Sequence, residues 1–439
     1  MGKASIIYVL GLSAIIAYAL LNINRSSTGS MDSFSEYYGR TMAHNIAVTG
    51  ANIGTEMLLR DYTYMAARTD SFGGGEYSFT VDSVNTRGDK RITAASVINL
   101  FDNIANHNVI RDTVVAYFRH TPFSKYGYFS GSETNGYMSP SSNSVPGGSM
   151  WKVTGDSIFG PAHTNGFWNF SGTPYFDDKV TASNAPNLAA GAHPIYNAGY
   201  EWGVTVDRPV ARLDDLQNVA ASGGKLFTGA STGNQDVGLT FSSDGKVRVK
   251  IPWNTGATKD TTYATVSSLA PNGVIMVDDI DVRVSGAYAG QVTVGARTGS
   301  SAGALKGNVW VQGDLVAATD PRINPNSTDM MGLVSERMTY VATTGIPRNS
   351  SSQTNIEAAI YCQNGVFAAE NYSTLPLSGR LNLFGGAVMN ASTSFGVMSG
   401  GVLTHGFLKS FRYDSRFLTQ SPPAFPFANK YELVSWWEK

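Results

Sequence analysis

The chain has 439 residues, of which 42% are hydrophobic and only 15% are charged, and its formal net charge is −1. Because no basic stripe accompanies this near-neutral balance, the sequence excludes an electrostatic case for nucleic acid binding. Cys362 is the only cysteine, which excludes an intramolecular disulfide and a cysteine-ligated structural zinc site.

The first predicted element is an apolar helix over residues 4–23, a stretch without any charged residue. Twenty apolar residues are about the number that an α-helix needs to cross a bilayer. Lys3 precedes the stretch and Arg25 follows it, so the charge asymmetry is small, but a short basic N-terminus favours a cytoplasmic N-terminus. We therefore expect the large folded body to lie outside the cytoplasm.

Two alternatives to a membrane anchor stay open for this stretch. Ala17 and Ala19 flank Tyr18 in the small-x-small pattern of a signal-peptide cleavage site. The stretch is also long enough to be the core helix of a soluble protein, although it has no polar face.

A polar joint over residues 24–30 separates this helix from a second helical pattern, which runs from Met31 to about Met65. Large apolar residues recur there at helical spacing. Small residues, which let helices approach closely, lie alongside them. Two interpretations stay open: this half packs on its own β body, or it bundles with copies of itself. The predicted helix-packing residues are Ala43, Ala47, Gly50, Ala51 and Gly54.

The apolar span, the polar joint and the helical segment over residues 37–59 together resemble the N-terminus of pilus-assembly proteins of the PilX kind, and through them type IV pilins and pseudopilins. The resemblance implies a helix that packs with other pilin-like subunits, and it makes Gly2 and Lys3 a possible leader cleavage site. The glutamate that type IV pilins carry at the fifth mature position has no counterpart in this apolar span.

From Gly73 onwards the pattern predicts β-structure. Three glycines (residues 73–75) break the helix, and residues 76–84 alternate as a strand. Residues 92–120 are mixed, with a strand or a short helix at 110–118. Residues 121–150 are rich in Ser, Gly, Asn and Pro, which is typical of an exposed loop.

Three later blocks share short alternating strands separated by Gly, Asn or Asp turns: residues 157–183, residues 272–296 with their continuation 303–320, and residues 364–389. This repetition predicts a right-handed β-helix or another β-solenoid, with a β-sandwich as the alternative. The expected fold class is α+β, with a transmembrane or filament-core helix (1–30), its amphipathic continuation (31–72), mixed strands and loops (73–156), and a solenoid-like body with a C-terminal cap (157–439).

These blocks and the C-terminal tail resemble a bacterial envelope domain of unknown function, the DUF4900 type, over roughly residues 30–439. The resemblance implies a pilin-like helix joined to a β-helical body in the cell envelope. Its most specific positions are Tyr413, Asp414, Arg416, Pro422, Pro423, Phe425, Pro426, Trp436, Trp437 and Glu438.

Residues with catalytic or metal-binding potential are sparse. His163 and His193 lack a ligand partner at metal-site spacing, so we interpret both as structural, like His44 and His405. Asp278, Asp279 and Asp281 form an acidic run, and alternation places the last two on one face of a strand. That face is either solvated, which we favour, or part of a calcium site.

The remaining candidates are conditional on the fold. On a β-helix, Asp314, Asp320 and Arg322 would be candidates for a carbohydrate-acting site. Aromatic clusters at 126–129, 168–176 and 436–437 would be core residues, glycan platforms or interface anchors; of Trp436 and Trp437, one should be exposed. The sequence assigns no catalytic, cofactor-binding or metal residue, and it predicts no cofactor.

Our leading hypothesis is a structural, non-enzymatic subunit: pilin-like or pilus-associated, anchored in the inner membrane or assembled in an extracellular filament. Its partners would be copies of itself or other pilin-like subunits, bound through the N-terminal helix, and the membrane before assembly. The alternatives are a monomeric membrane-anchored adhesin or glycan-binding module, with surface glycans as partners, and a β-helix enzyme that acts on polysaccharides.

Overall fold

The computed structural model describes residues 2–438 except 86–87, 103–105, 123–125, 143–146, 207, 209, 211–212, 255, 300–304 and 345–350. One long N-terminal helix is followed by β-rich structure, which confirms the α+β class. The chain forms two compact units: unit 1 comprises Met1–His120 and Asn429–Lys439, and unit 2 comprises Thr121–Ala428. These boundaries differ from those placed at residues 72 and 156 from the sequence. Unit 2 is inserted in the chain between two segments of unit 1.

Helix α1 (Gly2–Arg60) is continuous over 59 residues and passes through the polar joint without a break. In the joint, hydroxyl groups donate to carbonyls one turn earlier: Thr28 Oγ1 lies 2.8 Å from Asn24 O, and Ser30 Oγ lies 2.8 Å from Ser26 O. Such back-bonding satisfies the hydroxyls inside the helix. The helix ends at Arg60 rather than near Met65.

Unit 1 contains one five-stranded sheet with the order β1-β2-β3-β4-β30. The pairs β1–β2, β2–β3 and β3–β4 are antiparallel. Gly73 and Gly74 join β1 to β2 with φ of 60° and 85°, the positive values that a tight two-residue hairpin requires. The segment at 110–118 is strand. The bounds are β1 Ala67–Phe72, β2 Gly75–Ser83, β3 Lys90–Asp102, β4 Asn106–Pro122 and β30 Phe427–Glu438.

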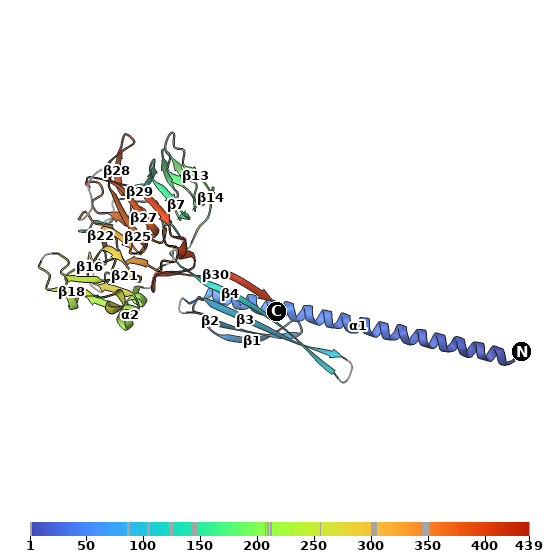
Figure 1. The fold of residues 1–439 in the computed structure, drawn as a ribbon. Coiled ribbons are helices and arrows are strands. Elements are labelled where there is room, and N and C mark those ends of the chain that lie inside the picture. The colour runs from blue at the N-terminus through green and yellow to red at the C-terminus, as the bar shows by residue number, and fades with distance from the viewer. Residues whose placement is uncertain are drawn as a thin grey trace. The chain divides into compact units, whose positions relative to one another are not determined.

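The second part of α1 packs on one face of this sheet. The helix residues that are buried all lie between Gly39 and Leu58, and they contact β2 and β3. Alternate strand residues, among them Tyr77, Phe79 and Ile92, complete this core. Residues 2–38 have no such cover and are exposed; Figure 1 shows this part of α1 extending beyond its sheet.

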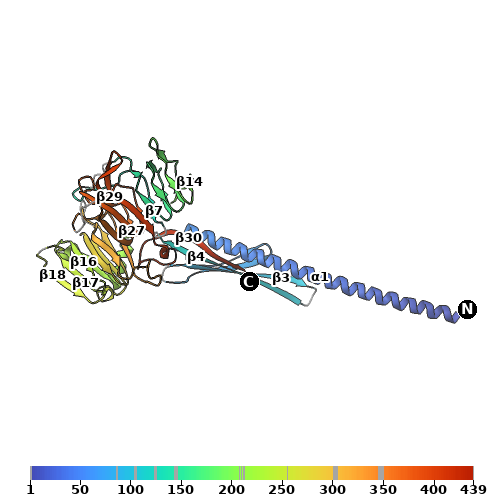
Figure 2. The same cartoon turned by 45° about the horizontal axis from the view of Figure 1, so that its top comes forward.

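Unit 2 consists of short strands that pair mostly in parallel. From β19 onwards, most strands pair with the strand two steps later along the chain: β19 with β21, β20 with β22, β21 with β23, β22 with β24, β23 with β25, β24 with β26, β25 with β27, and β27 with β29. Two antiparallel additions are the meander β16-β17-β18 and the hairpin β28–β29. Figures 1 and 2 show β27, β29 and β7 side by side.

The parallel register stacks like residues on one another. Ile275, Val294, Leu333, Ile360 and Ala387 are successive partners across five strands, and all five are buried in the main core of unit 2. Such ladders bury one apolar face of each strand against the next.

The strands before the helices of unit 2 are short: β5 Tyr128–Ser130, β6 Trp151–Val153, β7 Ser157–Phe159, β8 Ala162–Thr164, β9 Asn169–Ser171, β10 Tyr175–Phe176, β11 Val180–Ala182, β12 Asn187–Leu188, β13 Ile195–Tyr196 and β14 Tyr200–Trp202. The middle part contains α2 Leu213–Gly223, β15 Lys225–Thr228, α3 Gly229–Thr232, β16 Val237–Phe241, β17 Val247–Ile251, β18 Lys259–Tyr263 and α4 Val266–Leu269. The last part contains β19 Val274–Asp278, β20 Val282–Tyr288, β21 Gln291–Arg297, β22 Val309–Ala317, β23 Met330–Ser335, β24 Thr339–Val341, β25 Gln353–Cys362, β26 Phe367–Ala369, β27 Leu377–Met389, β28 Gly396–Ser399, β29 Val402–Tyr413 and the 3₁₀ turn Ser415–Leu418.

The prediction of an exposed loop over residues 121–150 is wrong for much of its described part. β5 is buried, and so are Glu133, Tyr137 and Met138. The loop-like composition misleads because neighbouring strands cover this segment: β5 pairs with both β8 and β27.

Candidate functional site

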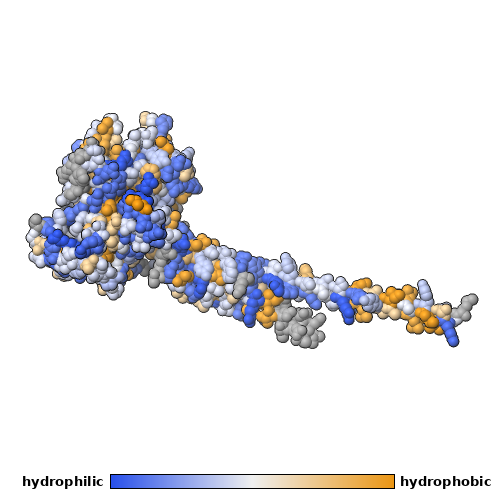
Figure 3. Space-filling view, in the orientation of Figure 1, coloured by the Kyte–Doolittle hydropathy of each residue, from blue (hydrophilic) through white to orange (hydrophobic). Residues whose placement is uncertain are grey.

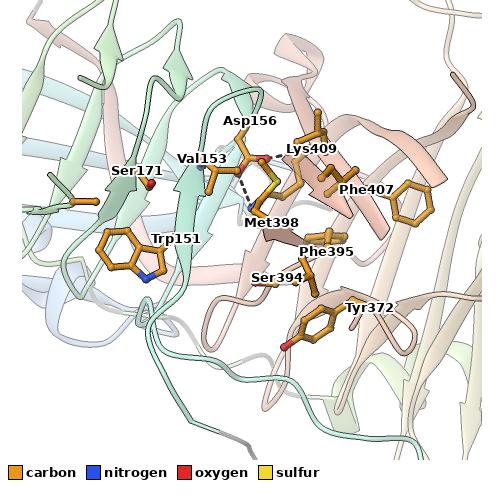
Figure 4. Close-up of a pocket in the computed structure, with 15 residues that line it drawn as sticks. Trp151, Val153, Asp156, Ser171, Tyr372, Ser394, Phe395, Met398, Phe407 and Lys409 are labelled. Carbon is orange, nitrogen blue, oxygen red and sulfur yellow. Dashed lines mark hydrogen bonds and ion pairs between the residues drawn. The ribbon is translucent and has the colours of Figure 1, made fainter. Parts of the chain in front are cut away.

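A cavity of about 440 Å³ opens in unit 2 beside β6, an edge of the three-stranded sheet β12-β9-β6, and the hairpin β28–β29 (Figure 4). Its lining is mainly apolar and aromatic, with a few polar groups, as is usual for ligand sites. The lining residues are Trp151, Val153, Asp156, Ser171, Ala189, Tyr372, Ser394, Phe395, Gly396, Val397, Met398, Leu403, Phe407, Leu408 and Lys409.

Strand alternation gives β6 two different faces. Trp151 and Val153 line the cavity, whereas Lys152 between them points into the core. There Lys152 Nζ lies 2.6 Å from Glu133 Oε2, and the two side chains are 3% and 1% exposed. Lys152 also donates to Tyr128 Oη at 3.1 Å and to Ser392 Oγ at 3.2 Å. Because a buried, hydrogen-bonded ion pair is costly to break, this cluster fixes β6 and therefore the position of Trp151.

The second oxygen of the Glu133 carboxylate also accepts hydrogen bonds. Oε1 accepts hydrogen bonds from Tyr128 Oη at 3.0 Å and from Ser130 Oγ at 2.5 Å. Burial, together with the Glu133 charge, raises the pKa of Tyr128 well above its usual value, so the phenol keeps its proton and remains a donor. The Tyr128 hydroxyl therefore contributes a stable donor to the hydrogen bonds behind β6.

A second ion pair, between Asp156 and Lys409, lies in the cavity wall itself. The parallel register of β29 on β7 pairs Ser410 with Ser157, which brings together two residues 253 positions apart. Lys409 Nζ lies 3.2 Å from Asp156 Oδ2. The backbone N–H groups of Lys409 and Val153 donate to the same carboxylate, each at 3.2 Å. The pair supplies one positive and one negative group, so the cavity wall has no net charge.

Three further groups give the cavity its polar and aromatic rim. Among the described residues, the Ser171 hydroxyl has no hydrogen-bond partner, and Ser394 Oγ has only the sulfur of Met150, 3.5 Å away, which is a weak acceptor. The Tyr372 ring lies edge-on to Tyr137, with 5.4 Å between centroids. Trp151 and Tyr372 are both half-buried, so their rings offer accessible faces.

The structure places the predicted helix-packing residues on the sheet-facing side of α1. Ala43, Ala47, Gly50, Ala51 and Gly54 are all buried. A Cβ added to Gly50 would lie 3.0 Å from Tyr77 Cδ2, and one added to Gly54 would lie 3.0 Å from Phe79 Cδ2. The close approach is thus made to the sheet of the same unit. Contact of this stripe with other subunits, and leader cleavage at Gly2 and Lys3, stay predictions.

The acidic run is not one strand face, and the solvated interpretation is wrong for Asp281. β19 ends at Asp278, and Asp279 has a left-handed φ of 63°, so the alternation assumed from the sequence is broken. Asp281 is 5% exposed and accepts from Asn308 and Trp310. Its burial, with a contribution from Asp236, raises its pKa. Within the described residues, no group of three or more His, Cys, Asp or Glu side chains could hold a metal ion.

Two of the histidines, His163 and His44, make ordinary structural contacts. His163 is buried in β8 and hydrogen-bonds Thr181 Oγ1 at 2.7 Å and Asn165 Oδ1 at 2.9 Å; its burial lowers its pKa, which favours the neutral ring. His44 Nδ1 lies 2.8 Å from Asp112 Oδ2 in unit 1. The Cys362 thiol is also buried, and burial raises its pKa.

Two of the three conditional enzyme candidates, Asp320 and Arg322, contact each other. Asp320 and Arg322 form a two-point ion pair at 2.8 and 2.9 Å, and Arg322 also pairs with Glu357. Asp314 instead accepts from the backbone N–H of Asn355. The charged groups of Asp320 and Arg322 are thus paired within unit 2.

The aromatic clusters are mostly core. Trp168, Phe170 and Phe176 are almost fully buried and pack against one another. Of the adjacent pair, Trp436 packs on the core of unit 1 and Trp437 is 55% exposed, which confirms that one is exposed.

Sequence reasoning missed the cavity residues Trp151, Asp156, Tyr372 and Lys409. The sequence offered one signal for this region. Lys152, a charged residue, stands between the apolar residues Trp151 and Val153 and points inward.

Comparison of the chain with protein-family models, with curated proteins and with solved structures found no match.

Proposed function

We propose that the protein is a structural, pilin-like subunit of the bacterial cell envelope. The first part of α1 enters a membrane and later a helical filament core, and the β-rich units form the outer surface. The observation that carries the proposal is the free part of α1. Residues 2–38 are exposed, and they extend over roughly 55 Å at 1.5 Å per residue.

The N-terminal end of this helix is too apolar for water. An 18-residue window of α1 has a mean hydropathy of 2.2, and none of it is buried within the chain. Figure 3 shows the apolar residues gathered towards the free end of the helix. Side chains such as Ile7 (72% exposed) and Tyr8 (76%) would each cost about 1.5–3 kcal/mol if left in water rather than buried. A bilayer or a bundle of helices supplies that burial.

A second apolar face distinguishes a filament subunit from a simple anchor. Beyond the apolar span, α1 exposes Met31, Phe34, Tyr37 and Tyr38, the first three at 70% each. With 3.6 residues per turn, these side chains lie between about 110° and 170° around the helix from the centre of the face that packs on the sheet of unit 1. The sheet therefore cannot cover them. A monomeric anchor needs no such face, whereas a subunit in a helix bundle buries it against its neighbours.

We propose further that unit 2 is a β-solenoid. Its support is the parallel pairing of most strands from β19 to β27 with the strand two steps later, and the ladder from Ile275 to Ala387. In a solenoid, each coil covers the apolar face of the next in this way. A body of this kind is rigid and well suited to the outside of a fibre.

The test removes each helix feature separately. Deletion of residues 2–30 should release a soluble monomer, as measured by membrane fractionation and sedimentation. A second variant replaces Met31, Phe34, Tyr37 and Tyr38 by Ser and keeps the apolar span. It should remain in the membrane fraction and lose assembly, as measured by cross-linking and electron microscopy. Filaments that form unchanged without residues 2–30 would contradict the proposal.

The second candidate function is a monomeric membrane-anchored binding module, which the cavity in unit 2 favours. The serine variant separates the two functions, because a monomeric anchor would show the same oligomeric state with and without the aromatic face.

A further inference from the structure

We propose that the cavity beside β6 and the β28–β29 hairpin is a sugar-binding site that takes one neutral pyranose ring of a glycan. This inference goes beyond the structural role proposed above, because it depends only on the side chains of unit 2. It rests on three features of the cavity: its aromatic faces, its unused hydrogen-bonding groups and its balanced charge.

The aromatic faces come from opposite sides. Trp151 projects from β6, and Tyr372 and Phe395 lie across the cavity from it (Figure 4). The Trp151 and Tyr372 rings are half-buried, so each presents an accessible face, and the edge-on contact with Tyr137 holds the Tyr372 ring in place. One face of a pyranose ring consists mainly of C–H groups, which pack against such aromatic rings as other apolar groups do.

The polar groups make a purely apolar occupant unfavourable. The Ser171 hydroxyl has no hydrogen-bond partner in the part of the chain that the structure describes, and the Ser394 hydroxyl has only a distant sulfur. Lys409 Nζ carries three donors, and Asp156 is its only ion-pair partner among the described residues. An apolar side chain in the cavity would cut these groups off from water without satisfying them. The hydroxyls of a sugar are both donors and acceptors and would satisfy them.

The charges select a neutral ligand. Asp156 and Lys409 lie 3.2 Å apart, so the field of each is largely offset by the other. An anionic or cationic ligand would gain from one member of the pair and be repelled by the other. A neutral sugar instead accepts from Lys409 and donates to Asp156. The cavity volume of about 440 Å³ lies within the usual range for small-ligand sites.

The backbone supports a preformed site. Three lining residues belong to one small parallel sheet: Val153 lies in β6, Ser171 lies in β9, and Ala189 directly follows β12. The Lys152–Glu133 pair anchors β6 from behind. Because the wall is held before any ligand arrives, binding requires little ordering.

The experiment uses the full chain in dodecylphosphocholine micelles, because glycoside detergents would themselves present sugars. The probes are the methyl pyranosides of glucose, galactose, mannose and N-acetylglucosamine, added separately and followed by saturation-transfer NMR. We expect transfer to the ring C–H protons of at least one probe. Trp151→Ala should weaken binding of that probe at least ~10-fold through loss of the aromatic face, and Ser171→Ala should weaken it ~3- to 10-fold through loss of one hydrogen bond.

Trp437→Ala is the matched control, because Trp437 is an exposed tryptophan of unit 1, and this variant should bind as the original chain does. Thermal unfolding of each variant shows whether it folds; if Trp151→Ala does not fold, Ser171→Ala decides. The proposal is overturned if none of the four probes shows saturation transfer, or if binding is unchanged in both cavity variants. It is equally overturned if toluene occupies the cavity and no methyl pyranoside displaces it.

Discussion

The two parts of α1 belong to one uninterrupted helix but have opposite surroundings. Between Gly39 and Leu58 the helix buries a small-residue face on β2 and β3, whereas residues 2–38 are exposed along their whole length. The backbone conformation is the same in both parts. What differs is whether the described chain covers the apolar side chains: it does so in the packed part and leaves them exposed in the free part.

The glycines show the same contrast at atomic scale. A Cβ added to Gly11 in the free part would meet nothing within 4 Å, whereas one added to Gly54 would lie 3.0 Å from Phe79 and 3.1 Å from Ile92. In the packed part a glycine is needed for close approach to the sheet. In the free part any need for glycine must come from a partner.

The largest expected effect is on the apolar span. Leu12→Lys combined with Ile16→Lys places two charges in the segment proposed to enter the bilayer, at about 2.5–3.5 kcal/mol each near its centre. The variant should move from the membrane fraction to the soluble fraction after cell fractionation. Thr41→Lys, on an exposed position of the packed part, is the control and should leave the distribution unchanged. A double-lysine variant that stays in the membrane would show that the span is not the anchor.

The next effect concerns the packed part. Gly54→Leu should lower the free energy of unfolding of unit 1 by about 3 kcal/mol, because the side chain overfills a tight contact with Phe79 and Ile92. Gly11→Leu is the matched variant and should leave that free energy unchanged. Chemical unfolding followed by circular dichroism measures both. Equal stability of the two variants would contradict the packing of α1 on this sheet.

The sequence was informative about the helix because its signals are local. The apolar stretch and the small residues from Ala43 to Gly54 are visible as composition and spacing. Which surface the small residues face was not visible, because a sheet and a second helix favour the same small side chains. The polar joint at residues 24–30 continues the helix, because Thr28 and Ser30 satisfy their hydroxyls within it.

The cavity could not be predicted because its residues meet only through long-range register. Asp156 and Lys409 become neighbours when Ser410 of β29 pairs with Ser157 of β7, and no local pattern encodes that pairing. The same holds for Asp281, whose partners Asn308 and Trp310 lie 27 and 29 positions further along the chain. The repeated short strands did predict a β-rich body, but the composition of residues 121–150 hid a buried strand.

A smaller effect is expected when one hydrogen bond between the helix and the sheet is removed. Ser96 in β3 is fully buried, and its hydroxyl donates to Ala43 O at 2.6 Å. Ser96→Ala should lower the free energy of unfolding of unit 1 by about 1 kcal/mol. Ser78→Ala removes an exposed hydroxyl from β2 and should have no measurable effect in the same denaturant titration. An unchanged midpoint for Ser96→Ala would show that this bond does not hold the helix on the sheet.

The smallest expected effect is a pH dependence of the stability of unit 1, whose sheet packs against α1. Burial lowers the pKa of Lys90, a residue of β3 that is 7% exposed. Since the unfolded chain then binds this proton more tightly than the folded chain, stability should rise as pH increases from the folded pKa towards the ordinary value of 10.5. Lys90→Met removes the titrating group, so thermal unfolding between pH 8 and pH 10.5 should show a smaller rise for the variant. Identical pH slopes for the two chains would mean that the Lys90 ammonium is as well solvated in the folded unit as in the unfolded chain.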